Sequence, residues 1–503
     1  MSYQVPVECL NEIFEHLDDK KTLYSCLLVN HFYCKISIRI LWRNIWRDIW
    51  CSRFIMTYNQ FLRVSSSILS TLFACLPKES KELLFKKGIF ISTPTSKPPM
   101  FNYPSFCKVL LIEKIFLIIS VALQKIPNTK NRNYLVINEV IKMFITQISS
   151  LKELSYSYYD DTYIMDSDDI SFTYFSGATD CLTNLSKLRC SLSLSSKFFY
   201  YLSKICHNLQ SLNIVFGLGI TKVPNELKEL ISLQNNLKDL KITAACSGDW
   251  KDIIPSLTKH SNTLTKLHLN NVFNDNLSVS FIALFSNLQE IKFSYSTRNF
   301  GEKQFSDFEK LQNVNFPKLQ YFNIPYHCTK PEYVMKFLEN NGKNLKKFVI
   351  KEEDCALNLS TAKFCPNLKN LSIAIRCDEL DTLRIIFNSC QYLESIKIWC
   401  GVRYLSDKEV LETIAIHSPE NFCKLKIYND SLSKSKLLPE DLESFFISWK
   451  NRPSKKSFTL LINKTYSSSS ISLEENEECM KIIKKYKNLG IIKKFETKFR
   501  EKI

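Results

Sequence analysis

The residue types that perform catalysis are present, but not in the spacings that catalysis requires. The sequence contains no P-loop, no complete G-x-G-x-x-G motif and no H-E-x-x-H motif, and Gly217 and Gly219 form an isolated pair. The 7 histidines are scattered, and none accompanies a Ser or Cys nucleophile motif. His417 and Cys423 are near in sequence, which says nothing about their geometry. We therefore expect a protein with no catalytic residues and no cofactor.

The 18 cysteines include no C-x-x-C pair, and the polar N-terminus, with Glu8, does not resemble a secretion signal. We therefore expect reduced thiols and no zinc or other metal site. The longest apolar run, Val109 to Leu123, is interrupted by Glu113 and Lys114 and is too short to span a membrane. A chain of 503 residues predicts two or more units, and we expect a cytoplasmic or nuclear location.

The most regular pattern in the chain is a repeated L-x-x-L-x-I motif, often preceded by Asn. Its ten clear copies begin at Leu185, Leu209, Leu237, Leu264, Leu288, Leu319, Leu345, Leu368, Leu393 and Phe422. A weaker copy begins at Leu151. The average spacing of about 26 residues is typical of leucine-rich repeats.

Alternating apolar residues in each copy predict a short strand with one buried face. A helix or an irregular turn then returns the chain, and we expect Phe387 and the segment from Leu405 to Ala415 on such helices. One copy cannot bury its apolar face alone, so the copies should stack. The predicted fold class is α/β, an irregular leucine-rich-repeat solenoid, or horseshoe, with a parallel sheet on its concave face.

Cysteines accompany the repeats at two places. Three precede the first Leu of a copy by three positions and are expected to be buried: Cys206, Cys365 and Cys390. Many leucine-rich repeats also place Asn or Cys just past the strand, where it bonds neighbouring turns. Here three cysteines fall one position too late for that role: Cys246, Cys328 and Cys377. We therefore predict that the ladder is missing and that the curvature is irregular.

The third, fifth and seventh positions of each motif should point to the concave face. Ten of these 30 positions in the main copies are basic, whereas 67 Lys and Arg in 503 residues predict about four. The basic residues are Lys187, Arg189, Lys241, Lys266, Lys292, Lys347, Lys351, Lys397, Lys424 and Lys426. Tyr321, Trp399 and Tyr428 are candidate aromatic anchors. The face could bind an acidic or phosphorylated protein segment, or lysine could simply be tolerated there in a chain of net charge +17.

The N-terminal residues predict three short helices. Leu10, Ile13, Phe14 and Leu17 share one helical face, and a second short helix carries Leu23. A third helix begins near Phe32 and closes with Leu41 and Trp42. So small a unit buries little surface of its own, and is expected to pack against something else.

Residues 5 to 46 resemble an F-box. The resemblance rests on Val5-Pro6, Glu8, Ile13-Phe14, Leu17, Leu23, Leu27-Leu28-Val29-Asn30, Tyr33-Cys34 and Leu41-Trp42-Arg43. Val5 and Tyr33 stand where the family usually has Leu and Trp, and both remain apolar. The resemblance implies contact with a Skp-family adaptor, or support of that contact, by Val5, Pro6, Leu10, Ile13, Leu17, Leu23, Val29 and Trp42. The alternative is a helical cap on the next domain.

An F-box followed by leucine-rich repeats resembles the substrate receptors of SCF-type cullin–RING ubiquitin ligases. The resemblance implies that the adaptor links the chain to a cullin and a RING subunit, while the repeats hold a client for ubiquitination and degradation by proximity. Two alternatives stay open. One is a scaffold that binds the adaptor without degradation, and the other is a binder of an acidic ligand such as a phosphopeptide, nucleic acid or inositol phosphate. Nucleic acid is the less expected partner.

The predicted boundaries are 1–47 for the F-box, 48–150 for a helical linker, 151–465 for the repeats and 466–503 for a lysine-rich C-terminal helix. In the linker, helices are expected at Phe61–Leu76, Phe106–Lys125 and Tyr134–Leu154. In the tail, Ser472 and Glu475 suggest a capping box, and lysines follow the acidic start of the helix. These lysines could bind a membrane or nucleic acid, but a solvated capping helix is favoured.

Overall fold

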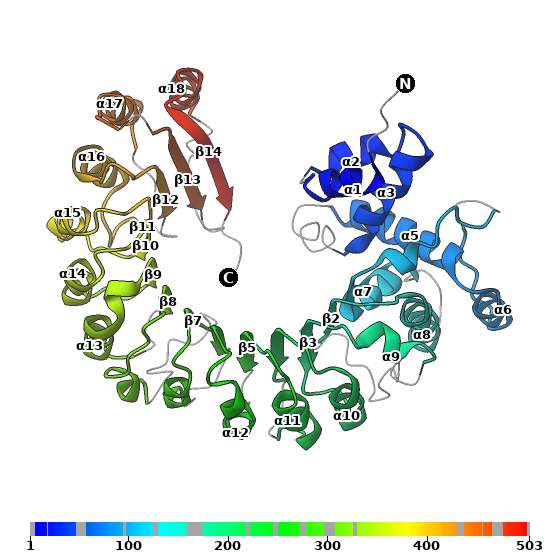
Figure 1. The fold of residues 1–503 in the computed structure, drawn as a ribbon. Helices are drawn as coiled ribbons and strands as arrows, with labels where there is room; N and C mark the ends of the chain where they lie inside the picture. Colours follow the sequence, from blue (N-terminus) through cyan, green and yellow to red (C-terminus); the bar gives the residue numbers. More distant parts are fainter. Residues whose placement is uncertain are drawn as a thin grey trace. The chain divides into compact units, whose positions relative to one another are not determined.

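The structure, a computed structural model, describes residues 6–17, 19–46, 57–93, 97–123, 129–157, 175–217, 222–244, 250–271, 278–295, 307–324, 329–429, 437–454, 456–464 and 476–499. The chain divides into two compact units, Met1–Leu237 and Lys238–Ile503. Each unit combines parallel strands with helices that return the chain from one strand to the next (Figure 1).

The first unit begins with three short helices, α1 (Val7–Glu15), α2 (Lys20–Cys26) and α3 (His31–Arg43). Asp19 accepts hydrogen bonds from the backbone N–H groups of Lys21 and Thr22 and so caps α2, while Asn30 caps α3. Leu10, Phe14, Leu23 and Ile36 form the buried centre. The side chains packed around that centre are Leu17, Cys26, Phe32, Tyr33, Ile40 and Leu41.

The linker is helical, but it also contains a strand. Its helices are α5 (Tyr58–Cys75), α6 (Lys78–Lys86), α7 (Ile112–Leu123) and α8 (Thr129–Gln147), with a short 3₁₀ helix, η1 (Tyr103–Phe106). The prediction of one helix from Phe106 to Lys125 is wrong at its start. Val109–Leu111 forms strand β1, which pairs in parallel with β2 (Glu153–Tyr156). An apolar run suits either element, and pairing with β2 selects the strand.

Every clear copy of the repeat motif contains a strand. In the first unit β2 is followed by β3 (Lys187–Ser191) and β4 (Ser211–Val215), with helices α9 (Ala178–Leu182), α10 (Ser196–Ile205) and α11 (Asn225–Ser232) between or after them. The pairs β1–β2, β2–β3 and β3–β4 are all parallel. The weaker copy at Leu151 supplies β2, so the motif also marks a strand there.

The second unit contains ten strands among its described residues, and neighbours in sequence pair in parallel. They are β5 (Asp239–Ala244), β6 (Lys266–Asn271), β7 (Glu290–Tyr295), β8 (Tyr321–Ile324), β9 (Lys347–Ile350), β10 (Asn370–Ile373), β11 (Ser395–Cys400), β12 (Lys424–Asn429), β13 (Phe458–Lys464) and β14 (Ile492–Phe499). This arrangement is the α/β, leucine-rich-repeat-like solenoid that the motif predicts.

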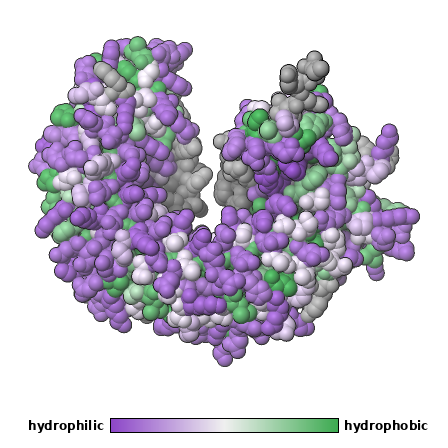
Figure 2. All heavy atoms as spheres, viewed as in Figure 1, coloured by the Kyte–Doolittle hydropathy of each residue, from purple (hydrophilic) through white to green (hydrophobic). Residues whose placement is uncertain are grey.

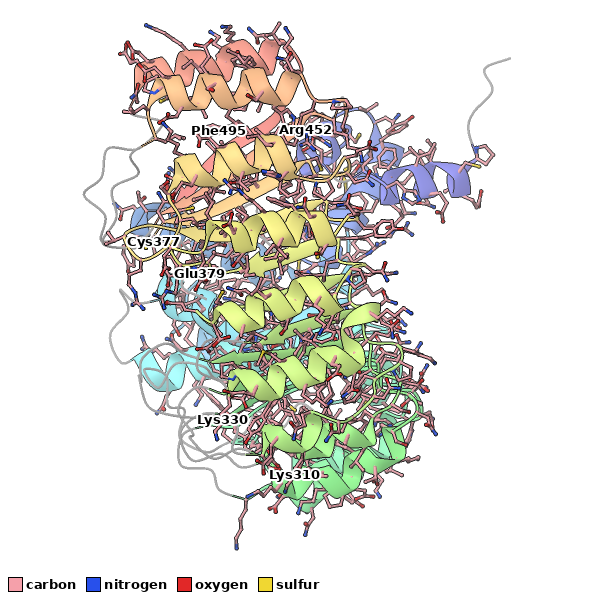
Figure 3. The ribbon with its side chains drawn as sticks, turned by 90° about the vertical axis from the view of Figure 1, so that its left-hand side faces the viewer. Lys310, Lys330, Cys377, Glu379, Arg452 and Phe495 are labelled. Carbon is pink, nitrogen blue, oxygen red and sulfur yellow. The ribbon has the colours of Figure 1, made fainter. Side chains whose placement is uncertain are left out.

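The returning segments of the second unit change along the chain. Between β5 and β8 they are short: α12 (Ile254–Leu257) and the 3₁₀ helices η4 (Lys251–Ile253), η5 (Thr258–His260), η6 (Ser280–Leu284) and η7 (Phe308–Leu311). After β8 they are α13 (Pro331–Asn341), η8 (Gly342–Asn344), α14 (Cys355–Phe364), α15 (Leu380–Ser389), α16 (Asp407–His417), α17 (Pro439–Lys450) and α18 (Glu477–Asn488). Figure 3 shows these later helices stacked as one layer in front of the strands. Phe387 and most of the segment from Leu405 to Ala415 lie on helices, as predicted.

The C-terminal region adds a strand that the sequence did not predict. Helix α18 is capped by Asn476, whereas the predicted capping residues Ser472 and Glu475 lie outside the described part of the chain. The lysine-rich residues after α18 do not continue as a helix. They form β14, which pairs with β13 over seven residues.

Three asparagines that directly precede the first Leu of a motif copy donate hydrogen bonds to the preceding copy. Asn287 Nδ2 donates to the carbonyl of Asn262 at 2.8 Å. Two further asparagines, Asn344 and Asn367, donate in the same way to carbonyls of the preceding copy. Of the three cysteines that fall too late for a ladder past the strand, Cys377 is exposed, and Cys246 and Cys328 lie outside the described residues. Asparagines that precede the motif therefore join these three pairs of copies.

The expected burial of the three cysteines before the repeats is confirmed, since Cys206, Cys365 and Cys390 are inaccessible to solvent. The Cys206 thiol lies 3.2 Å from the carbonyl of Leu182 in the preceding copy. Hydrophilic residues cover most of the visible face of the second unit, with hydrophobic residues scattered among them (Figure 2). None of the helices in the described ranges is long and apolar enough to cross a bilayer.

Candidate binding surfaces

The three N-terminal helices expose a set of large apolar side chains. Leu28 is 89% exposed, Val29 61% and Ile13 53%. Val7 and Tyr24 are also exposed. These side chains project from a unit whose own core is built from only four fully buried hydrophobic residues. Scattered exposed apolar residues are ordinary, but five within two dozen residues of such a small unit mark an interaction surface.

The residues predicted to serve adaptor contact fall into two groups. Pro6, Ile13 and Val29 are exposed, so they are available to a partner. The others support the unit instead: Leu10 and Leu23 are buried, Leu17 packs against the core, and Trp42 packs on the linker. Val5 lies outside the described residues. The prediction missed Leu28 and Tyr24, although Leu28 stands in the motif itself.

The end of α3 and the residues just after it are joined to the linker. The Trp42 ring stacks on Tyr103, with ring centroids 4.7 Å apart. Trp46 is completely buried, and its indole N–H donates to the carbonyl of Val109 at 2.7 Å. The backbone N–H of Lys108 donates to the carbonyl of Arg43 at 2.9 Å. These contacts hold the three helices on β1 and the residues around it.

An ion pair ties the first helix to the third. Arg43 donates hydrogen bonds to both carboxylate oxygens of Glu15. These bonds, followed by the opposing effect of burial, leave the pKa of Glu15 below its ordinary value, and they raise that of Arg43. Bidentate pairs of this kind are geometrically specific.

The second binding surface lies on the strand face of the second unit. A groove of about 400 Å³ crosses strands β7 to β12. Six lysines line it, and we call it the lysine groove: Lys292, Lys347, Lys351, Lys397, Lys424 and Lys426. No Asp or Glu is among the described residues that line it. Glu290, at the entry of β7, lies 2.8 Å from the imidazole of His268. The groove is therefore strongly cationic.

Aromatic rings contact three of these lysines, Lys347, Lys397 and Lys426. The ammonium of Lys347 lies 4.1 Å from the centre of the Tyr321 ring. Lys397 lies 4.0 Å from the ring of Tyr428 and 5.0 Å from that of Trp399. Burial, with the charge of Glu290, raises the pKa of Tyr321 to about 12, so its hydroxyl stays protonated at neutral pH. Cation–π contacts orient the ammonium groups without neutralising them.

Small polar residues form the floor of the lysine groove. Ser372 on β10 is 4% exposed, and its hydroxyl has no hydrogen-bond partner among the described residues. Asn370, Ser395 and Asn323 also line the groove. These residues occupy the outward positions of the motif, so the pattern places them on this face. These small polar residues were not predicted as site residues, because the prediction rests on charged and aromatic side chains.

The groove does not include every residue predicted on the concave face. Tyr321 lines it together with the six lysines, and Trp399 and Tyr428 lie against Lys397. Tyr428 is buried, so it supports a lysine rather than offering a free ring. The remaining predicted residues lie on other strands: Lys241 on β5, Lys266 on β6, and Lys187 and Arg189 on β3 of the first unit. Lys187 lies 3.9 Å from Glu153.

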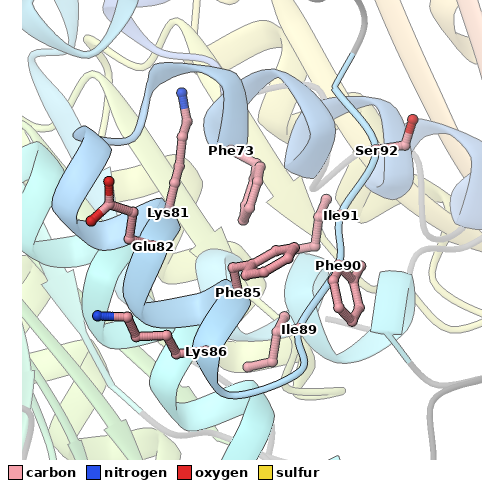
Figure 4. A pocket seen from close by; sticks show the side chains of 9 residues that line it. All are labelled: Phe73, Lys81, Glu82, Phe85, Lys86, Ile89, Phe90, Ile91 and Ser92. Atoms are coloured by element: carbon pink, nitrogen blue, oxygen red, sulfur yellow. The ribbon is translucent and has the colours of Figure 1, made fainter.

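An apolar hollow of about 710 Å³ lies in the linker, between α5, α6 and the residues after α6. In Figure 4, Phe73, Phe85, Phe90 and Ile91 surround it, with Lys81 and Lys86 nearby. Phe85 and Phe90 are exposed, and their rings meet edge to face. Neither this hollow nor α6 was predicted from the sequence, although the run from Lys81 to Ile91 is amphipathic.

Groups that could carry chemistry are few. The described residues contain no cluster of three or more His, Cys, Asp or Glu able to hold a metal ion. Burial raises the pKa of the thiols of Cys107, Cys190 and Cys206 to about 12. Such thiols are poor nucleophiles at neutral pH. The geometry offers surfaces for binding.

The fold assignment rests on the structure, because the comparisons with known proteins add no support to it. No protein family matches the chain, and no curated protein does either. Among solved structures, the chain has a likeness to the leucine-rich repeat-containing protein LegL7 from Legionella pneumophila. The two are 11% identical, with a TM-score of 0.31, over 69% of this chain and 94% of the other. At that TM-score the likeness adds no weight to the repeats and strands described above.

Proposed function

We propose that the chain is the substrate-recognition subunit of an SCF-type ubiquitin ligase. In this proposal the three N-terminal helices act as an F-box and dock on a Skp-family adaptor, which links them to a cullin and a RING subunit. The strand face of the second unit holds the client, which is ubiquitinated and then degraded. The chain itself contributes proximity and no reacting group.

The observation that carries the proposal is the exposed apolar surface of the N-terminal helices. Ile13, Leu28 and Val29 are exposed on a unit that is joined to the linker through Trp42 and Trp46. An exposed apolar surface on helices that are fixed to the linker suits a stable protein partner. The resemblance of residues 5 to 46 to an F-box indicates the kind of partner.

Adaptor recovery tests the proposal. Tagged full-length chain is expressed with a Skp-family adaptor, and the amount of adaptor that co-purifies is measured. Ile13→Asp with Val29→Asp places two charges on the exposed surface without touching the core, and recovery should fall at least about tenfold. The matched control is Ile416→Asp, which charges an equally exposed isoleucine on α16. Equal recovery from all three proteins would refute docking through this surface.

A scaffold that binds the adaptor without degradation is the second candidate, favoured by the same surface. Cellular turnover separates the two. Proteins that the chain captures should accumulate when cullin activity is blocked if it is a substrate receptor. Their levels should not change if it is a scaffold.

A further inference from the structure

We propose that the lysine groove binds a doubly phosphorylated client segment whose two phosphates are three residues apart. The inference rests on the proposed function, because it assigns the client to the strand face. It adds the chemical class of the recognised segment and the spacing of its charges. Four observations carry it: the arrangement of the lysines, the absence of lining carboxylates, the floor of β10 and the unpartnered hydroxyl of Ser372.

Five of the six lysines stand in two groups on either side of β10, and the sixth, Lys292, is on β7. Lys347 and Lys351 belong to β9 and the residue that follows it, while Lys397, Lys424 and Lys426 belong to β11 and β12. Strand β10 pairs with both β9 and β11 and contributes no charged residue to the lining. A phosphate monoester carries nearly two negative charges at neutral pH, so each group of two or three lysines matches one phosphate.

The distance between the two groups sets the spacing of the anions. Adjacent strands lie about 4.8 Å apart, so β9 and β11 are separated by about 10 Å. In a polyproline II conformation, residues three apart lie on one side of the chain and about 9.3 Å from each other. A β-strand puts same-side residues at about 7 or 13 Å instead. Phosphorylated residues at i and i+3 therefore match the lysine groups best.

The floor between the lysines suits the ligand backbone and one phosphate oxygen. Ser372 and Asn370 lie under the segment's path, and both are small enough to leave room for a peptide. The buried hydroxyl of Ser372 has no partner among the described residues, although buried polar groups are normally satisfied. A ligand oxygen supplies that partner. Tyr321 and Tyr428 keep Lys347 and Lys397 turned toward this floor.

Binding of synthetic peptides to the purified full-length chain tests the inference. Fluorescent nine-residue peptides carry one phosphoserine, or two at spacings of i,i+2, i,i+3 and i,i+6, and an aspartate pair serves as an unphosphorylated control. The i,i+3 peptide should bind at least about tenfold more tightly than the singly phosphorylated one, because charge-assisted hydrogen bonds contribute about 1.5–3 kcal/mol. Equal affinity at all three spacings would overturn the proposed geometry.

Variants of the chain locate the site. Lys397→Glu should weaken the i,i+3 peptide more than about tenfold, whereas Lys266→Glu, on β6 and outside the groove, should change it less than about twofold. Ser372→Ala should weaken binding severalfold while leaving the melting temperature unchanged or higher, because it removes an unpartnered buried hydroxyl. Equal losses from Lys397→Glu and Lys266→Glu would show nonspecific attraction and overturn the inference.

Two further probes separate the peptide from other polyanions. Inositol hexakisphosphate and poly(U) RNA are tested in the same assay, at the same salt. Tighter binding of either than of the i,i+3 peptide would overturn the assignment to a protein segment. The assay needs no adaptor, so failed peptide binding leaves the adaptor-recovery result untouched. Failed adaptor recovery likewise leaves the peptide result standing.

Discussion

The ammonium of Lys397 on β11 lies 4.0 Å from the centre of the Tyr428 ring on β12. The same ammonium lies 5.0 Å from the ring of Trp399, so two aromatic faces hold one cation. The two rings are themselves in contact, with centroids 5.5 Å apart. The buried Tyr428 therefore shapes a charged groove that its own ring does not line.

Removing the Tyr428 ring should weaken anion binding by releasing Lys397. Tyr428→Leu keeps an apolar side chain but loses the ring, and the contact is worth about 0.5–1 kcal/mol. Affinity for the i,i+3 phosphopeptide should fall by about two- to fivefold. Tyr428→Phe keeps the ring and should bind like the wild type. If both variants bind alike, the ring does not orient the lysine.

Two leucines of the N-terminal helices should respond in opposite ways. Leu23 is buried at the centre of the three helices, so Leu23→Ala should cost about 2–5 kcal/mol of local stability. Leu28 is almost fully exposed, so Leu28→Ala should leave stability within about 0.5 kcal/mol and still weaken adaptor recovery. Hydrogen exchange of peptides spanning α1 to α3 measures the first quantity. Faster exchange in the Leu28 variant would contradict its assignment to the surface.

Acid should loosen the contact between α1 and α3. The pKa of Glu15 is lowered in the folded protein by the hydrogen bonds from Arg43. A depressed folded pKa contributes stability that is fully present above the ordinary Glu value of about 4.3, and that is lost as pH falls through the lower folded value. Below pH 4.3, the protection of α1 amides, relative to their intrinsic exchange rate at each pH, should fall in the wild type toward that of Glu15→Gln. At pH 7 the wild type should be the slower of the two.

Gln234 should be sensitive to truncation although it belongs to neither binding surface. Its side chain is fully buried, accepts from the backbone N–H of Leu209 and donates to the carbonyls of Cys206 and Leu230. Gln234→Ala removes the hydrogen-bond partner of these backbone groups, and each unsatisfied group costs about 1–3 kcal/mol. Thermal unfolding should show a clear fall in melting temperature. The neighbouring Asn235→Ala serves as the control and should unfold like the wild type.

The strands of the repeats could be predicted because their pattern repeats. Leu188, Leu240 and Ile396 occupy the same motif position, and all are buried, on β3, β5 and β11. Strands β1, β13 and β14 could not be predicted, since they lack the full motif and depend on pairing with a neighbour. Val109–Leu111 is a short apolar run that would suit a helix equally well.

The charge of the candidate site could be predicted, but its extent could not. The outward positions of Lys347 and Lys397 follow from the alternation within each motif. Which lysines share one groove depends on the packing of neighbouring strands, and this separates Lys397 from Lys266. The role of Ser372 depends on an unsatisfied hydroxyl, which only coordinates reveal.

The buried cysteines give three copies of the repeat a reporter of their own. Cys206, Cys365 and Cys390 lie in different copies, and burial raises the pKa of the Cys206 and Cys390 thiols to about 12. An alkylating reagent can modify such a sulfur only when the surrounding helix and strand come apart. Mass spectrometry of labelled peptides would therefore measure the rate at which individual turns of the solenoid open locally. The measurement needs no engineered probe and no change to the native sequence.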